Sequence, residues 1–118
     1  MQSTYSLKSF DVFDLSKKLV IACYALTANL PSEEKTVLTQ YIRNAALSVH
    51  VSIAQGAFLK KKKARKKFLS EAKNALVVID AAVDVLVETG LAKAEATTEV
   101  QQLSSTCYQL LDRLKKEN

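Results

Sequence analysis

The sequence concentrates positive charge in one short stretch. Seven of its seventeen basic residues fall within eight consecutive positions, namely Lys60, Lys61, Lys62, Lys63, Arg65, Lys66 and Lys67. Cations this close together repel one another, and those that begin a helix also oppose the positive end of its dipole. Local stability would favour Asp or Glu at such positions. Because phosphate groups would neutralise the charge, the stretch predicts a polyanion site, with nucleic acid as the first candidate.

This basic cluster, residues 60–67, has other interpretations that stay open. One is a solvated turn that improves solubility, and another is a site for an acidic protein or for lipid headgroups. The tyrosines do not interleave with the lysines, since they stand at Tyr5, Tyr24, Tyr41 and Tyr108. Stacking of bases on aromatic rings is therefore not indicated, and recognition of shape and backbone is favoured over base readout.

The other polar residues do not form a pattern that is typical of catalysis. The sequence has no glycine-rich phosphate loop, and its one histidine, His50, lacks a partner at the spacing of a bundle metal site. Asp80, Asp84 and Glu88 recur every fourth residue, which is more typical of a solvated strip or an ion-pair row than of metal ligands. We therefore expect no enzyme activity, no catalytic residues, no cofactor and no metal.

The composition is that of one helical domain over residues 1–118. Hydrophobic residues make up 48% and charged residues 25%, while two glycines and one proline leave few places for turns. The first ten residues lack the apolar core of a signal peptide, and no apolar run reaches the ~18 residues that span a bilayer. Cys23 and Cys107 are expected to be buried free thiols. We expect a soluble, cytoplasmic protein with no membrane partner.

Apolar periodicity and turn residues predict four helices, at about residues 7–29, 33–58, 64–89 and 93–116. Pro31 should end the first helix and Gly90 the third. Short connections between four helices favour an antiparallel up-down-up-down four-helix bundle, so the predicted fold class is all-α. The basic cluster then lies at the corner between the second and third helices.

The third predicted helix is more apolar than one bundle requires. Leu76, Ile79 and Val83 form an inward stripe, yet further apolar residues leave only a thin polar strip. A helix that is apolar around most of its circumference must be covered on nearly all sides, and one bundle covers only part of it. We therefore expect a homo-oligomer whose interface contains Leu47, Val51, Val77, Val78, Ala81 and Val85.

The second predicted helix carries a segment that resembles a known family. The matching words are LTQYIRNAALSV at 38–49 and IAQG at 53–56, followed more loosely by KKFL at 66–69 and TGL at 89–91. They are similar to the bacterial four-helix bundle family typified by the protein encoded in intervening sequences of 23S ribosomal RNA genes. The resemblance covers most of the chain in order and length.

The resemblance implies an antiparallel four-helix bundle that assembles as a ring-like homopentamer, usually without assigned catalytic activity. The same superfamily includes the accessory variability determinant of diversity-generating retroelements, a basic pentamer that binds nucleic acid and the element's reverse transcriptase. The family motif carries over Arg43 as a functional cation, and Lys66 and Lys67 as the matching basic pair. Without the resemblance, Arg43 is a single cation expected to pair with Glu33, Glu34 or another acidic neighbour.

The chain departs from the family pattern at three positions. Where the family commonly has a Pro, an Asn and a Glu, this chain has His50, Ser52 and Gln55. The helix should therefore be less kinked, and the corner more positive. The favoured hypothesis is a non-enzymatic oligomeric bundle that binds RNA or DNA through phosphate contacts at the basic corner. The alternative is a structural or adaptor pentamer that docks a protein partner, such as the reverse transcriptase of a diversity-generating retroelement.

Overall fold

The computed structural model describes residues 7–57 and 59–117, and helices are the regular secondary structure within these ranges. The elements are α1 (Leu7–Ala28), α2 (Ser32–Ala57), α3 (Lys62–Glu88), the short 3-10 helix η1 (Ala94–Thr97) and α4 (Thr98–Glu117). The prediction of an all-α fold with four α-helices is confirmed. No helix in these ranges combines the length and the apolarity that crossing a membrane requires.

The predicted helix boundaries agree with the structure to within two residues, except at the start of the last helix. We predicted that this helix begins near residue 93, which is wrong, because residues 94–97 form η1 and α4 begins only at Thr98. The hydroxyl of buried Thr97 donates to the carbonyl oxygen of Ala94 at 2.7 Å. Such a local bond offers the backbone an alternative to the α-helical pattern. Phe58, the predicted end of the second helix, lies outside the described residues.

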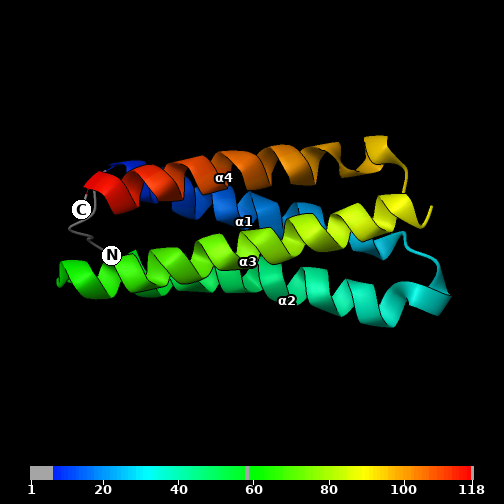
Figure 1. Cartoon of the computed structure of the whole chain (residues 1–118), viewed down its shortest axis with the longest axis horizontal. Helices are drawn as coiled ribbons and strands as arrows, with labels where there is room; N and C mark the ends of the chain where they lie inside the picture. The colour runs from blue at the N-terminus through cyan, green and yellow to red at the C-terminus, as the bar shows by residue number, and fades with distance from the viewer. Residues whose placement is uncertain (1–6, 58, 118) are drawn as a thin grey trace.

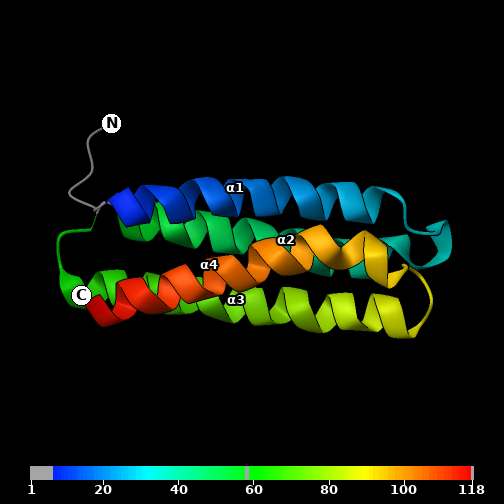
Figure 2. The same cartoon turned by 90° about the horizontal axis from the view of Figure 1, so that it is seen from above.

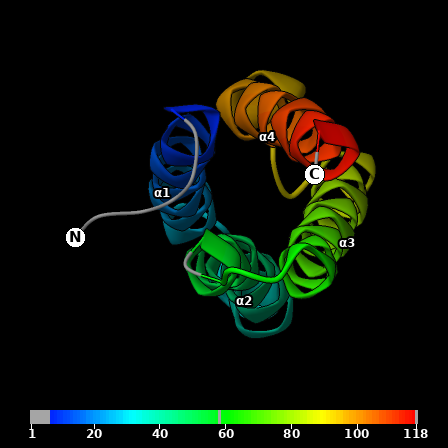
Figure 3. The same ribbon diagram turned by 90° about the vertical axis from the view of Figure 1, so that its left-hand side faces the viewer.

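The four α-helices lie side by side in an elongated molecule of 45 × 22 × 21 Å (Figure 1). Seen along the long axis they form a closed square in which α4 returns beside α1 (Figure 3). The packing follows this order, since each helix contacts the next one and α1 also contacts α4. The start of α3 and the end of α4 lie at the same end of the molecule, on the left in Figures 1 and 2.

The turn after α3 depends on a glycine. Gly90 has a φ of +76°, a left-handed conformation that glycine adopts without the penalty of a side chain. The N–H groups of Leu91 and Ala92 both donate to the carbonyl oxygen of Leu86, at 3.0 and 3.1 Å. These bonds satisfy a carbonyl that the end of the helix leaves without a partner. The stop predicted at Gly90 is confirmed, and α1 likewise ends before Pro31.

The core is formed by the apolar stripes that the sequence predicts. Burying one Leu, Ile or Val side chain contributes about 1.5–3 kcal/mol. Both cysteines are buried free thiols, as predicted, and burial raises the pKa of each to about 12. Fully or almost fully buried side chains of α2 and α3 are Ile42, Val49, Ile53, Leu69, Ala72, Leu76, Ile79, Val83 and Leu86.

Candidate nucleic-acid interface

The basic cluster lies at the corner between α2 and α3, at one end of the molecule (Figure 2). Its first two residues, Lys60 and Lys61, are in the connection, and the other five are in the first two turns of α3. The first turn of α3 has no acidic residue, and Lys61 at its N-cap makes no side-chain hydrogen bond. The structure therefore brings all seven predicted cations to the positive end of the α3 dipole. Five of them are exposed: Lys60, Lys61, Lys62, Lys63 and Lys67.

Arg65 differs from the lysines because it holds the connection together. Its Nη1 atom donates to the carbonyl oxygen of Leu59 at 3.1 Å and to that of Lys60 at 2.7 Å. The planar guanidinium, with several fixed donors, can reach two carbonyls at once, which a lysine ammonium does less well. Arg65 is half-buried in this position. We therefore assign it first to the shape of the corner and only second to the binding of an anion.

The six lysines of the cluster keep their charge uncompensated within the part of the chain that the structure describes. None of them forms an ion pair with a carboxylate there, and the ion pairs found join Lys73 and Lys116 to Asp112. Glu71, one turn after Lys67, does not reach it. Like charges on neighbouring turns destabilise a helix by a few tenths of a kcal/mol per pair. An external anion would remove this repulsion.

Arg43 does not join the basic cluster. It lies in the middle of α2, 14 residues before Ala57, which is about 21 Å along the helix axis. Its Nε atom donates to the hydroxyl of Thr27 at 2.8 Å, and its Nη2 atom donates to the carbonyl oxygen of Tyr24 at 3.3 Å. The guanidinium also stacks 4.3 Å from the centroid of the Tyr24 ring.

These contacts tie α2 to α1 and account for Arg43 without an ion pair. The side chains of Glu33 and Glu34, its expected partners, lie outside the described residues. The role that the resemblance gives to Arg43 as a functional cation stays a prediction.

His50 makes a contact between helices that the sequence did not indicate. Its Nδ1 atom lies 2.7 Å from the hydroxyl of Ser16, which also donates to the carbonyl oxygen of Phe13 at 2.8 Å. The imidazole and Phe13 rings have centroids 4.5 Å apart. Burial, and then the nearby charge of Lys17, lower the pKa of His50. Ser16 is fully buried, so this pair ties α1 to α2 and offers no accessible nucleophile.

The predicted interface residues are exposed in the single chain. Val77, Val78 and Val85 on α3 are 55%, 41% and 45% exposed. Leu47 and Val51 on α2 are 39% and 48% exposed, and Ala81 is exposed as well. A single bundle leaves about half of each of these large side chains in water, and the exposed part contributes nothing to stability. Their placement fits the expectation of a further apolar contact.

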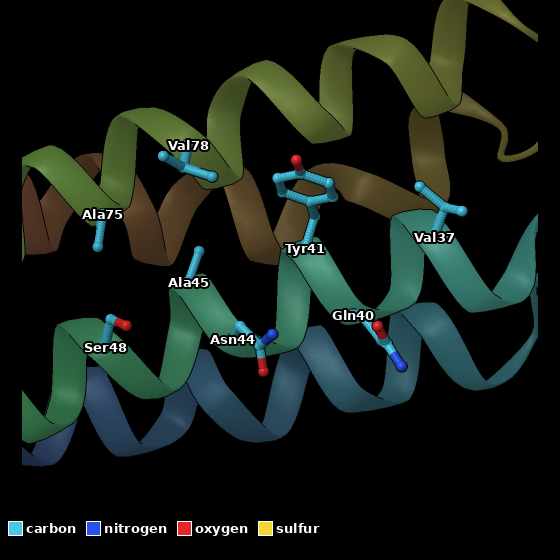
Figure 4. A pocket seen from close by; sticks show the side chains of 8 residues that line it. All are labelled: Val37, Gln40, Tyr41, Asn44, Ala45, Ser48, Ala75 and Val78. Carbon is cyan, nitrogen blue, oxygen red and sulfur yellow. The ribbon is translucent and has the colours of Figure 1, made fainter.

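A shallow groove of about 410 Å³ lies between α2 and α3 on the same side of the molecule. Figure 4 shows Tyr41 of α2 between Val78 of α3 and Val37, which lies nearer the start of α2. Small residues, Ala45 and Ala75, line it where the two helices approach each other (Figure 4). Val78 is thus shared by the groove and the exposed valines of α3, while Gln40, Asn44 and Ser48 make part of the groove polar.

The acidic residues of α3 do not gather into a metal site. The Oδ1 atom of Asp80 accepts a hydrogen bond from buried Ser104 of α4 at 3.1 Å, and Asp84 and Glu88 are exposed. No three potential metal ligands come together in the described ranges. The three carboxylates form a strip along the half of α3 that is remote from the basic cluster.

Comparison with known proteins places the chain in a family. A search of the curated proteins gave no match. The model of the 23S rRNA-intervening sequence protein family matches residues 8–114. The match includes α2 with its departures at His50, Ser52 and Gln55, the basic cluster and nearly all of α4. Since the match extends over far more than half of the sequence, the chain belongs to the 23S rRNA-intervening sequence protein family.

Proposed function

We propose that this protein binds RNA or DNA through phosphate contacts made by its basic cluster. The supporting observation is the set of six lysines that have no carboxylate partner within the described residues and stand at the positive end of α3. A phosphate backbone would supply negative charge to these lysines, which have no such partner within the described residues. The cluster has no interleaved tyrosine. Phosphate contacts would therefore position a nucleic acid without reading its bases.

The proposed activity is binding and not catalysis. His50, the one histidine, is used in the contact between α1 and α2. Asp80 is used in the contact between α3 and α4. Asp80 and Asp84 line an open hollow, but the other residues that line it, Val77, Ala81 and Gln101, supply no nucleophile of the kind that a hydrolytic site requires.

We also propose that the binding molecule is a homo-oligomer of antiparallel bundles, joined through the exposed apolar surface of α2 and α3. The exposed valines of α3 and the adjoining groove favour this contact. Several copies would present several basic clusters to one nucleic acid, and linked sites raise the apparent affinity without new contacts. A ring-like homopentamer is the assembly that the family resemblance implies.

The test compares two variants of equal net charge. Replacing Lys62 and Lys63 by Gln removes two exposed cations of the cluster, and replacing Lys18 and Lys93 removes two exposed cations elsewhere. Binding of a labelled 24-base-pair duplex is measured by fluorescence anisotropy between ~50 and ~200 mM salt. The first variant should reduce the slope of log affinity against log salt by up to about 2, because each duplex phosphate contact contributes about 0.9. Arg65 is kept, because it shapes the connection.

The control variant should bind almost as the wild type does. Equal losses in both variants would mean that only the overall charge matters. In that case, and also if the wild-type protein does not bind at ~50 mM salt, the proposed function is wrong. RNA and DNA duplexes of one sequence, tested in parallel, distinguish the two nucleic acids.

A second candidate function is that of an adaptor that docks a protein partner, such as a reverse transcriptase. The exposed apolar surface of α2 and α3 favours it, because a protein partner can cover that surface as well as another copy can. The two candidates predict different behaviour of the pure protein. A monomer that binds no nucleic acid would favour the adaptor.

A further inference from the structure

The contacts between α3 and α4 bring the last turn of α4 to the beginning of α3. The Nζ atom of Lys73 lies 2.8 Å from Oδ1 of Asp112, while Asp80, further along α3, contacts Ser104, earlier on α4. Residue numbers on the two helices therefore run in opposite directions along this seam. Residue 116, four positions after Asp112, comes level with about residue 69 of α3. Figure 2 shows the end of α4 beside the start of α3.

Both helices present lysines to this seam. Lys62, Lys66 and Lys73 are spaced by four and seven residues, so they share one face of α3. The ion pair of Lys73 with Asp112 shows that this face is turned toward α4. The last turn of α4 in turn contains Lys115 and Lys116. The basic residues at this end of the molecule therefore extend beyond the connection between α2 and α3.

A single carboxylate of the seam is shared by two of these lysines. The Nζ atom of Lys116 lies 3.0 Å from Oδ2 of Asp112, whose Oδ1 atom is bound by Lys73. The hydrogen bond from Lys73 and then that from Lys116 hold the pKa of Asp112 at about 2. The side chain of Lys116 remains 78% exposed in this pair. Its ammonium group can therefore still approach an anion from the solvent.

Local stability explains only part of this arrangement. Lysines in the last turn of α4 suit the negative end of its dipole. The first turn of α3, at the same end of the molecule, would favour acidic residues because of its positive dipole, but it contains none. Two cations on neighbouring helices about 10 Å apart repel each other by about 0.4 kcal/mol in water. A negatively charged partner from outside the chain would account for the lysines at the start of α3 and for those at the end of α4.

The same face of α3 also limits where such a partner can lie. Asp80 and Asp84 follow Lys73 by seven and eleven residues, so they continue the face that carries the lysines. Along α3 the seam therefore carries lysines from Lys62 to Lys73, about 16 Å along the axis, and carboxylates beyond them. Asp112 of α4 already pairs with Lys73 at the far end of this stretch. This length matches about five nucleotides of a duplex strand at 3.4 Å each.

We propose that Lys115 and Lys116 of α4, with Lys62 and Lys66 of α3, form a second row of phosphate contacts, so that the nucleic acid follows the α3–α4 seam as far as Lys73. This inference rests on the proposed function and adds a surface and a direction to it. Two rows of cations on adjacent helices fit the backbone of a duplex better than a loop alone does, because several phosphates of one strand can be contacted in register.

The test replaces Lys115 and Lys116 by Gln and measures the salt dependence of duplex binding as before. We expect the slope to fall by about 1 to 2, with the Lys18 and Lys93 double variant as the matched control. The single Lys115→Gln variant leaves the ion pairs of Asp112 intact and should lower the slope by up to about 1. Circular dichroism and thermal unfolding show whether each variant keeps the fold.

The outcomes separate this inference from the function on which it rests. If the Lys115 and Lys116 variants keep the wild-type slope while the Lys62 and Lys63 variant loses binding, the nucleic acid stays at the corner and the seam is not used. If the wild-type protein binds no duplex, both proposals fail. Loss of slope in both pairs of variants, with the control unchanged, supports the seam.

Discussion

Arg65 and its lysine neighbours carry the same charge but have different roles. The guanidinium of Arg65 is engaged by the carbonyl groups of Leu59 and Lys60, whereas the lysines around it have no carboxylate partner in the described residues. Sequence alone gives seven cations of one kind. Arg65 and the lysines differ in role because of the path of the connection between α2 and α3. Hydrophobic periodicity in the sequence does not predict that path. A mutation series that includes Arg65 would therefore confuse a change of shape with a loss of charge.

The contact of His50 with Ser16 was not predicted for a similar reason. A serine in the apolar stripe of α1 and a histidine on α2 are 34 residues apart, and only the relative shift of the two helices brings them within 2.7 Å. Arg43 meets Thr27 in the same way. The inward stripe of α3, with Leu76, Ile79 and Val83, was predicted from the sequence, but the register between the helices was not.

His50 makes stability depend on pH. Its pKa is lowered in the folded protein, so the unfolded chain binds the proton more readily. Its contribution should be complete above the unfolded pKa of about 6.5 and decline as the pH falls below that value. Urea unfolding at pH 7.5 and 5.5 measures this. The His50→Gln variant should lack this part of the pH dependence, and an identical dependence in both proteins would contradict the role of His50.

At the scale of elements, the helices follow from their apolar stripes and stop signals. The inward stripe predicted for α3, Leu76, Ile79 and Val83, is buried, and α2 and α3 both end within two residues of the expected position. The start of α4 was missed because Thr97 turns its hydroxyl back to Ala94, and a threonine gives no sign of this in the sequence. Lys115 and Lys116, at the end of α4, were not predicted as phosphate contacts, because only the fold shows which residues of α3 lie near them.

The turn after α3 gives a prediction for a single element. Gly90→Ala should lower the free energy of unfolding by about 1 kcal/mol, because the φ of +76° places the added Cβ in an unfavourable conformation. No atom lies within 4 Å of that Cβ, so the cost comes from the backbone and not from a clash. Gly90→Asn should cost less, since asparagine tolerates this region. Equal stability of the wild type and the alanine variant in urea unfolding would refute the prediction.

At the scale of the whole molecule, the exposed apolar surface of α2 and α3 is where we propose that copies of the chain meet. Val78→Glu should reduce the mass of the assembly in sedimentation experiments, because it places a carboxylate on the proposed contact. The side chain is 41% exposed in the single chain, so the bundle itself should remain folded. Gln109→Glu, on the exposed side of α4, is the matched control and should leave the mass unchanged. An unaltered mass for Val78→Glu would place the subunit contact elsewhere.

The function of the whole molecule was the least accessible to sequence reasoning. The basic cluster was visible because its residues are consecutive, and all seven indeed meet at one corner. The seam between α3 and α4 joins residues about 50 positions apart. Their spacing in the sequence does not indicate that they lie close together in space. Sequence reasoning located the basic cluster because its residues are neighbours in the chain. It did not locate the proposed seam, because only packing brings the residues of the seam together.

The uneven distribution of charge along the 45 Å molecule has a further consequence for how it meets a partner. Lysines crowd one extremity, while Glu88, Glu95 and Glu99 stand on the segments at the other. Such a molecule has an electric dipole moment along its long axis. The electric field of a nucleic acid would therefore turn the molecule before the two make contact. The molecule would then meet the nucleic acid with its lysine-rich end first. Added salt would lower the association rate and also weaken the final complex.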